Sequence, residues 1–143
     1  MSPLNLTSTN LQALASGLRV LLVDDVAMNR RVAELFLHRL GCSVVSAESA
    51  QSALERIRVQ EFDVVMTDVE MPDLGGMEAL ALFREADARA HPQRLRRLAV
   101  MAVSAGVVGM EHGDYLAAGF DEHLAKPLEL DQLRRALARL QSA

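Results

Sequence analysis

Charged and hydroxyl side chains stand at the ends of four apolar runs in the sequence. They are three aspartates, a serine and a lysine: Asp24, Asp25, Asp68, Ser104 and Lys126. If the runs are parallel strands, their carboxyl ends meet at one edge of a sheet and these side chains converge there. Three carboxylates and one ammonium then leave about two net negative charges, and two like charges about 4 Å apart repel by about 4 kcal/mol at an effective dielectric of about 20. Such a cluster must take up a proton or hold a cation.

A divalent cation that prefers oxygen ligands is the simpler solution for this cluster. Mg²⁺ suits one or two carboxylates completed by waters and phosphate oxygens. Asp24 and Asp25 are the natural holders of the metal, whereas Asp68 stands alone at the end of a central strand. Zinc is not indicated, because the lone cysteine and the four scattered histidines lack the spacing of zinc ligands. The sequence therefore predicts a Mg²⁺ site.

A carboxylate, a divalent cation, a hydroxyl and a lysine together are typical of phosphoryl transfer. The metal and Lys126 would neutralise oxygens of the transferring group, and Asp68 is the best candidate for the nucleophile. Each residue alone has a simpler explanation. An acidic pair after a strand is often a solvated turn, Ser104 at a strand end is more often a helix cap, and Lys-Pro is usually a loop. Their joint occurrence at the ends of alternate elements favours the functional interpretation.

Lys126 also stands out by composition. The chain has fourteen arginines and this single lysine. Codon bias explains the arginines, but it does not explain the one position that remains lysine. Arginine and lysine differ most where a compact point charge must fit a tight site, so Lys126 is a candidate site residue before any motif is considered.

The elements that must position these residues alternate between apolar runs and helical patterns. Strands are expected at residues 18–23, 42–47, 62–67, 98–103 and 120–125. Gly41 closes the helix after the first strand, Ser49 caps the next helix, and a third helix is expected over residues 77–89.

Apolar residues recur at helical spacing in the first and last of these helices. One face of the first carries Met28, Val32, Leu35, Phe36 and Leu40, and one face of the last carries Leu130, Leu133, Leu137 and Leu140. The fourth helix, near residues 108–118, contains Gly109 and Gly113. Since each interior glycine costs about 1 kcal/mol relative to alanine, this helix should be the loosest.

Five strands, each followed by a helix, make five βα units of one α/β domain. Strands that read as continuous apolar runs are buried on both faces, which is typical of a parallel sheet covered by helices. Right-handed crossovers leave few topologies, and a doubly wound sheet places its functional crevice at the carboxyl ends of the strands. We expect a flexible tail or linker over residues 1–17 and the domain over residues 18–143.

Composition narrows the class of protein. The chain has 143 residues, a formal charge of −4 and 50% hydrophobic residues, which fits one domain and excludes a disordered or collagen-like chain. No apolar stretch is long enough to span a membrane and no signal peptide is visible, so no direct membrane contact is expected. The lone Cys42 suits a reducing cytoplasm. The acidic balance argues against nucleic-acid binding, and Arg94, Arg96 and Arg97 are interpreted as a solvated surface.

Several segments resemble the receiver (response regulator) domain of two-component signalling. They are residues 20–25 with Asn29-Arg30, 66–72 with Gly76, 103–105, 118–121 and 124–128. The resemblance covers residues 18–140 and implies a flavodoxin-like, doubly wound (βα)5 fold with a parallel sheet of strand order 2-1-3-4-5. Asn29-Arg30 and Lys126-Pro127-Leu128 are similar to the residues of receivers in hybrid histidine kinases and phosphorelays.

The resemblance implies a set of Mg²⁺ ligands. Asp25 and Asp68 ligate the metal directly in this pattern, and the backbone carbonyl of Glu70 is the third protein ligand. Asp24 acts mostly through a coordinated water.

The resemblance also implies how a phosphoryl group is held. Asp68 accepts it from a phosphohistidine, and Ser104 and Lys126 each bond one of its oxygens. The backbone N–H groups of Val69 and Ala105 are further donors. The Lys126-Pro127 bond resembles the cis peptide of the family, which costs only about 0.5 to 1 kcal/mol before proline.

Partners and output follow from the same resemblance. The phosphoryl donor is expected to be a histidine kinase or a histidine phosphotransfer domain that docks near the first helix, around Asn29, Arg30 and Val32. Phosphorylation of Asp68 should bias a two-state element formed by the fourth helix and the fifth strand. The domain itself would catalyse only its own phosphotransfer and dephosphorylation, whereas a parent histidine kinase would be an enzyme.

Several functions stay open at this point. The leading interpretation is the receiver part of a hybrid sensor histidine kinase, and the first alternative is a free-standing response regulator. A second is a docking module that works without phosphorylation. A third is a metal-dependent phosphatase similar to haloacid-dehalogenase-like enzymes, which expect Asp-x-Asp on the first strand and match Asp68-Val69-Glu70 poorly. Only three residues follow Leu140, so no output domain is expected, and no oligomeric state is predicted.

Four positions depart from the family pattern. Ser104 stands where threonine is usual, and switching should survive because both carry the hydroxyl. His123 stands where tyrosine or phenylalanine is common, and we favour an exposed imidazole there over a group that titrates near neutral pH. Leu74-Gly75-Gly76 replaces the usual Met-Asp-Gly, which loosens the loop. Glu70 is expected either to reach the cation or Lys126, or to point to solvent.

Overall fold

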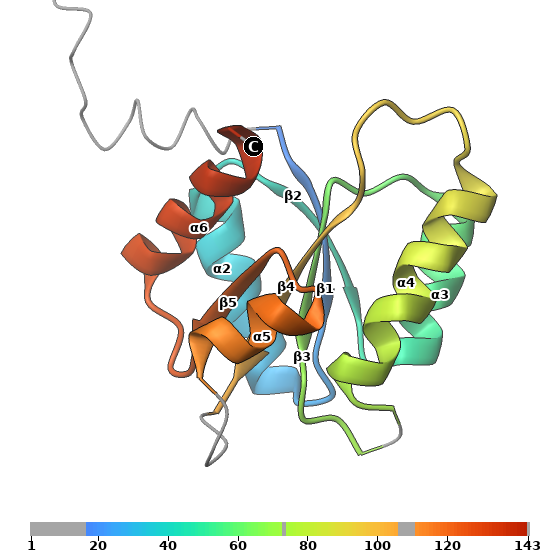
Figure 1. Ribbon diagram of the computed structural model, residues 1–143. Helices are drawn as coiled ribbons and strands as arrows, with labels where there is room; N and C mark the ends of the chain where they lie inside the picture. The colour runs from blue at the N-terminus through green and yellow to red at the C-terminus, as the bar shows by residue number, and fades with distance from the viewer. Residues whose placement is uncertain (1–16, 73, 106–110, 143) are drawn as a thin grey trace, which may run out of the picture.

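The structure, a computed structural model, describes residues 17–72, 74–105 and 111–142. Strands and helices alternate through this part of the chain (Figure 1). The strands are β1 (Arg19–Val23), β2 (Ser43–Ala47), β3 (Val64–Asp68), β4 (Ala99–Ser104) and β5 (Glu122–Ala125). The helices are α2 (Ala27–Arg39), α3 (Ala50–Val59), α4 (Gly76–Ala90), α5 (His112–Ala118) and α6 (Leu130–Ser142). The five expected βα units are therefore present.

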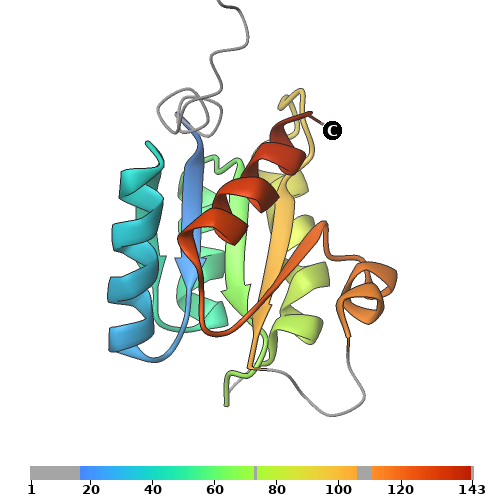
Figure 2. The same ribbon diagram turned by 90° about the vertical axis from the view of Figure 1, so that its left-hand side faces the viewer.

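The strands form one parallel sheet in the order β2-β1-β3-β4-β5, so the predicted doubly wound fold is confirmed. All carboxyl ends lie along the lower edge of the sheet in Figures 1 and 2. The register at this edge pairs Asp68 with Val103 and Ser104 with Ala125. The chain winds to one side of β1 and then to the other, so the switch point, where such sheets form their ligand sites, lies between β1 and β3.

Helices cover both faces of the sheet (Figure 1). Val20 and Leu22 of β1 pack in a cluster with residues of α2 and α6, whereas Leu21 and Val23 pack in a second cluster with residues of α3, α4 and α5. Successive side chains of a strand point to opposite faces. A strand covered on both sides therefore needs an apolar residue at every position, which is why these strands read as continuous apolar runs.

Side chains mark where two of the helices begin. The Ser49 hydroxyl accepts the Ser52 N–H at 3.0 Å and caps α3, as predicted. Glu111 and Asp114 form a reciprocal capping box at α5, so this helix begins at His112 rather than near residue 108. Gly109, which was expected inside the helix, lies outside the described residues.

The apolar face predicted for α2 is only partly buried. The helix packs on the sheet through Ala33 and Leu37, whose small and medium side chains let it approach closely. Met28, Val32 and Leu35 instead have exposed fractions of 66%, 40% and 60%. The prediction of a single apolar face was wrong here, because helical spacing cannot tell a stripe that faces the sheet from one that faces solvent.

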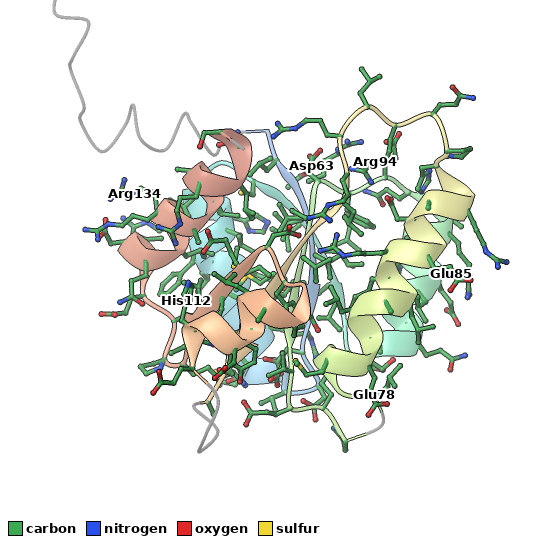
Figure 3. The ribbon with its side chains drawn as sticks, in the orientation of Figure 1. Asp63, Glu78, Glu85, Arg94, His112 and Arg134 are labelled. Carbon is green, nitrogen blue, oxygen red and sulfur yellow. The ribbon has the colours of Figure 1, made fainter. Side chains whose placement is uncertain are left out.

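The interpretation of the arginine cluster as a solvated surface was wrong for Arg94, whereas Arg97 is exposed as expected. The Arg94 side chain is only 10% exposed and pairs with Asp87 of α4, and Arg97 pairs with Asp121, which precedes β5. The carboxylates of Asp87 and Asp121 thus hold the connection between α4 and β4. This anchor lies far from the carboxyl edge: Figure 3 shows Arg94 at one end of the molecule and Glu78 at the other.

The predicted tail stays largely untested. Of residues 1–17, only Gly17 is described, and its N–H donates to the Gly41 carbonyl at 3.0 Å in the turn after α2. Within the described ranges, no helix has both the length and the apolar character needed to cross a membrane.

Gly76 is the tightest point in the loop that follows β3, and it generates a stability prediction. A Cβ on Gly76 would lie 2.8 Å from the Val69 Cα and 3.1 Å from the Asp68 carbonyl oxygen. Because these are backbone atoms, Gly76→Ala should lower the free energy of unfolding in urea by about 1 to 3 kcal/mol. Gly113→Ala is the matched control: no atom lies within 4 Å of its added Cβ, so it should stabilise the protein by up to about 1 kcal/mol. Equal effects of the two substitutions would contradict this account.

Candidate functional site

The carboxylates of Asp24, Asp25 and Asp68 meet at the switch point of the sheet. Asp24 and Asp25 directly follow β1, and Asp68 is the last residue of the neighbouring strand β3. One oxygen atom from each side chain lies within 4.8 Å of the other two. Asp24 and Asp68 are buried whereas Asp25 is exposed, so the cluster is open to solvent on one side. The structure thus brings Asp68 to an acidic pair that lies far from it in the sequence.

Lys126 reaches this cluster from the end of β5. Its Nζ lies 3.2 Å from Asp68 Oδ2 and 3.9 Å from Asp24 Oδ2. Its backbone N–H donates to the Ser104 carbonyl at 2.7 Å, and its peptide bond to Pro127 is cis, as the resemblance implied. The backbone of Lys126 is therefore fixed on both sides of the residue, and its ammonium lies between two carboxylates.

Backbone N–H groups hold the two buried carboxylates in place. Asp24 Oδ1 accepts the Val26 N–H at 2.9 Å, and Asp68 Oδ1 accepts the Glu70 N–H at 3.0 Å. Burial raises the pKa of Asp24 above its usual range, although the Val26 N–H opposes the shift and the charge of Asp68 adds to it. The protein therefore carries a carboxylate that is harder to ionise than usual beside a second one.

The three carboxylates fit a divalent cation. The oxygens of Asp24, Asp25 and Asp68 are hard donors, they lie within reach of one small ion, and Asp25 leaves room for waters to complete its shell. Lys126 alone cannot neutralise the three charges. A cavity of about 470 Å³, lined among others by Asp68, Ala105 and Lys126, adjoins the cluster and can admit a group larger than water. The backbone carbonyl of Glu70 as a further ligand stays a prediction.

The side chain of Glu70 is exposed, as one of the two expectations had it, but it also makes a contact that neither expectation included. Its Oε1 accepts the backbone N–H of Ala105 at 2.6 Å. The second N–H expected as a phosphoryl donor, that of Val69, donates to the Val103 carbonyl at 3.1 Å. Both N–H groups therefore have partners inside the protein.

His123 is not the exposed imidazole that we expected. Its Nε2 lies 2.8 Å from Ser104 Oγ, and its ring stacks on Tyr115 of α5 with centroids 4.1 Å apart and an interplanar angle of 7°. His112 lies 5.5 Å away, ring centroid to ring centroid. The prediction failed because the Tyr115 ring of α5 covers one face of the His123 ring.

 The stacking partner lies on a different element, so the alternation of residues along β5 does not reveal it.

The contacts of Glu70 and His123 are the parts of the site that sequence reasoning missed. Both depend on side chains that cross from one strand end to the next, and such pairs leave no periodic signal. Two weak signals were present. Glu70 lies only two residues after Asp68, and Tyr115 is the only tyrosine of the chain.

Comparison with known proteins places this geometry in a family. Residues 20–138 match the response regulator receiver domain, and the chain belongs to this family. The sensor histidine kinase AruS of Pseudomonas aeruginosa is 40% identical over 131 residues, which cover 90% of this chain and 12% of that protein. The chain therefore spans a small part of the length of this curated relative. The phosphatase alternative predicted similarity to haloacid-dehalogenase-like enzymes, whereas the chain belongs to the receiver family.

Solved structures agree with this assignment. The receiver domain of the histidine kinase CKI1 from Arabidopsis thaliana, complexed with Mg²⁺ and BeF₃⁻, is 28% identical with a TM-score of 0.74, covering 94% of this chain and 96% of that chain. The receiver domain of Ssk1 from Saccharomyces cerevisiae, in complex with the phosphotransfer protein Ypd1, is 22% identical with a TM-score of 0.74, covering 87% and 89%. The second likeness shows the shared fold. The chain is thus similar to the receiver domains of histidine kinases, and the solved structure of the CKI1 receiver contains Mg²⁺.

The environment of His123 generates a prediction about pH. Burial lowers the pKa of His123 below its usual value of 6.5, and the neighbouring His112 lowers it further. In the window just below pH 6.5, the unfolded chain therefore binds more protons than the folded protein, and stability should fall as the pH falls through this window. His123→Phe keeps an aromatic ring against Tyr115 and should remove this slope, which corresponds to at most about one proton.

Urea unfolding at several pH values between about 5 and 8 measures this effect. His38→Phe, at an exposed position of α2, is the control and should keep the slope of the wild type. An unchanged slope in His123→Phe would contradict the assignment.

Proposed function

We propose that this receiver domain takes a phosphoryl group from a phosphohistidine onto Asp68 and changes conformation in response. The observation that carries the proposal is the position of the Asp68 carboxylate. It is buried at the switch point of the sheet, 3.2 Å from the Lys126 ammonium and beside the carboxylates of Asp24 and Asp25. A nucleophile, a compact cation and a metal-binding pair are thus combined at one edge of a receiver fold.

The proposed transfer needs little covalent chemistry from the protein. A carboxylate oxygen of Asp68 attacks the phosphorus atom, the bond between phosphorus and the donor imidazole nitrogen breaks, and that nitrogen keeps the electron pair. Lys126 bonds one phosphoryl oxygen, while Asp24 and Asp25 with Asp68 hold Mg²⁺, which supplies positive charge to the phosphoryl oxygens when bound. Catalysis in this proposal rests on positioning and on charge neutralisation.

The conformational response would begin at Ser104. Its hydroxyl is bonded to His123 at 2.8 Å, and to bond a phosphoryl oxygen it would have to exchange that partner. His123 stacks on Tyr115, so the exchange would be felt in α5 and β5. Phosphorylation would then shift the population of a pre-existing state by as much as that state binds the phosphoryl group better.

We further propose that the domain is the receiver part of a hybrid sensor histidine kinase and works in the cytoplasm. The relatives named above support this origin, since AruS and CKI1 are histidine kinases. The partner would be a histidine kinase or a histidine phosphotransfer domain, as Ypd1 is for the Ssk1 receiver. Val32 of α2 lines the cavity beside the site, and with the exposed Met28 and Leu35 of the same helix it would offer such a partner an apolar contact surface.

Asp68→Asn tests the acceptor directly. The variant retains an oxygen for the Glu70 N–H but lacks the carboxylate nucleophile, so it should lose covalent labelling by acetyl phosphate with Mg²⁺ almost completely. Labelling is measured by intact-protein mass spectrometry. Asp63→Asn, which removes a carboxylate at the opposite end of β3, is the control and should be labelled like the wild type. Undiminished labelling of Asp68→Asn would disprove the assignment.

Lys126→Arg separates phosphorylation from switching. A guanidinium is wider than an ammonium and would crowd the metal and Ser104, so the variant should fold and accept a phosphoryl group at Asp68 but lose most of the conformational response. The chain has one tyrosine and no tryptophan, so the fluorescence of Tyr115 in α5 reports on that response. A normal fluorescence change on phosphorylation of Lys126→Arg would leave codon bias as the explanation of the single lysine.

A further inference from the structure

The strongest feature that the proposed transfer does not use is the bridge made by Glu70 between the ends of β3 and β4. Its backbone N–H donates to Asp68 Oδ1 at 3.0 Å, and its side-chain Oε1 accepts the Ala105 N–H at 2.6 Å. One residue thus contacts both the acceptor carboxylate and the backbone that follows Ser104. We propose that the Glu70 carboxylate is an internal competitor of the phosphoryl group: it occupies the Ala105 N–H in the unphosphorylated protein and must leave before a phosphoryl oxygen can bind there. This inference rests on the proposed phosphorylation of Asp68.

The positions of Asp68 and Ala105 support competition for one donor. Asp68 pairs with Val103 in the sheet, and Ala105 lies two residues further along the same strand direction. Asp68 and Ala105 line the same cavity of about 470 Å³, so a group attached to Asp68 would enter a space that Ala105 borders. An N–H has one hydrogen to donate, and a carboxylate oxygen and a phosphoryl oxygen are both anionic acceptors for it.

Charge and exposure determine how strong this competition is. Glu70 adds a fourth carboxylate to an edge that holds Asp24, Asp25 and Asp68 with one lysine. Glu70 and Ala105 are both exposed, so the carboxylate can turn into solvent without disturbing the core. The competition should therefore be modest. The apparent affinity for a phosphoryl group is reduced by the fraction of molecules in which Glu70 occupies the donor.

Beryllofluoride with saturating Mg²⁺ is the probe, because it mimics a phosphoryl group without requiring a donor. Glu70→Ala should bind beryllofluoride about three- to tenfold more tightly than the wild type, which is the effect expected from one exposed charge-assisted hydrogen bond. The affinity for Mg²⁺ alone should change less than about twofold, since the competition concerns a donor and not the metal. In the metal-free protein, the Ala105 amide proton should move upfield in the NMR spectrum of Glu70→Ala.

Glu48→Ala is the matched control for charge. Glu48 is exposed and follows β2 at the same edge of the sheet, so its removal changes the net charge equally without touching Ala105. Glu48→Ala should leave the beryllofluoride affinity within about twofold of the wild type, because salt screens the charge of an exposed carboxylate that does not contact the site. A gain in Glu48→Ala equal to that in Glu70→Ala would overturn the proposal in favour of a general charge effect.

The remaining outcomes separate this inference from the proposed function. A wild type that binds beryllofluoride while Glu70→Ala binds it no more tightly would overturn the competition alone. A weaker Mg²⁺ affinity in Glu70→Ala would also overturn it, because the side chain would then belong to the metal site. A wild type that does not bind beryllofluoride, or Asp68→Asn that binds it as the wild type does, would overturn the proposed function and the competition with it.

Discussion

Repulsion among three carboxylates at one sheet edge is the constraint on which the rest of this structure depends. Asp24, Asp25 and Asp68 come together because parallel strands end at the same edge and the winding of the chain changes direction between β1 and β3. Backbone N–H groups and one ammonium at 3.2 Å offset part of the repulsion. Burial raises the pKa of Asp24 and the charge of Asp68 adds to the shift, and the remaining negative charge makes the edge a site that gains by holding a divalent cation.

Much of this arrangement could be predicted from the sequence, because it follows from the order of the elements. Continuous apolar runs indicated strands buried on both faces, and the polar residues at their ends had to share an edge once the strands were parallel. Ser49 as a helix cap and Lys126 as the isolated cation were visible as single residues. The ends of elements were less predictable. The capping box of Glu111 sets the start of α5, and it depends on a local reciprocal contact rather than on periodicity.

The features that could not be predicted are contacts between side chains of different elements. Helical spacing marked Met28 and Leu35 as apolar but did not show that the sheet lies behind Ala33 and Leu37. The charge of Arg94 predicted a solvated side chain, whereas Arg94 forms a buried ion pair with Asp87. In each case the position of a partner, which only the tertiary structure supplies, decides whether a polar or apolar residue is buried.

The two unpredicted contacts at the site have a common consequence for switching. Ser104 and Ala105 are neighbours at the end of β4, and both of the groups through which they would hold a phosphoryl oxygen already have partners, in His123 and Glu70. In the proposed function, phosphorylation would therefore not fill empty donors but exchange two existing hydrogen bonds for two bonds to the phosphoryl group. The free energy available for switching is the difference between these two sets, so the residues that hold the unphosphorylated state control the response as much as those that hold the phosphoryl group.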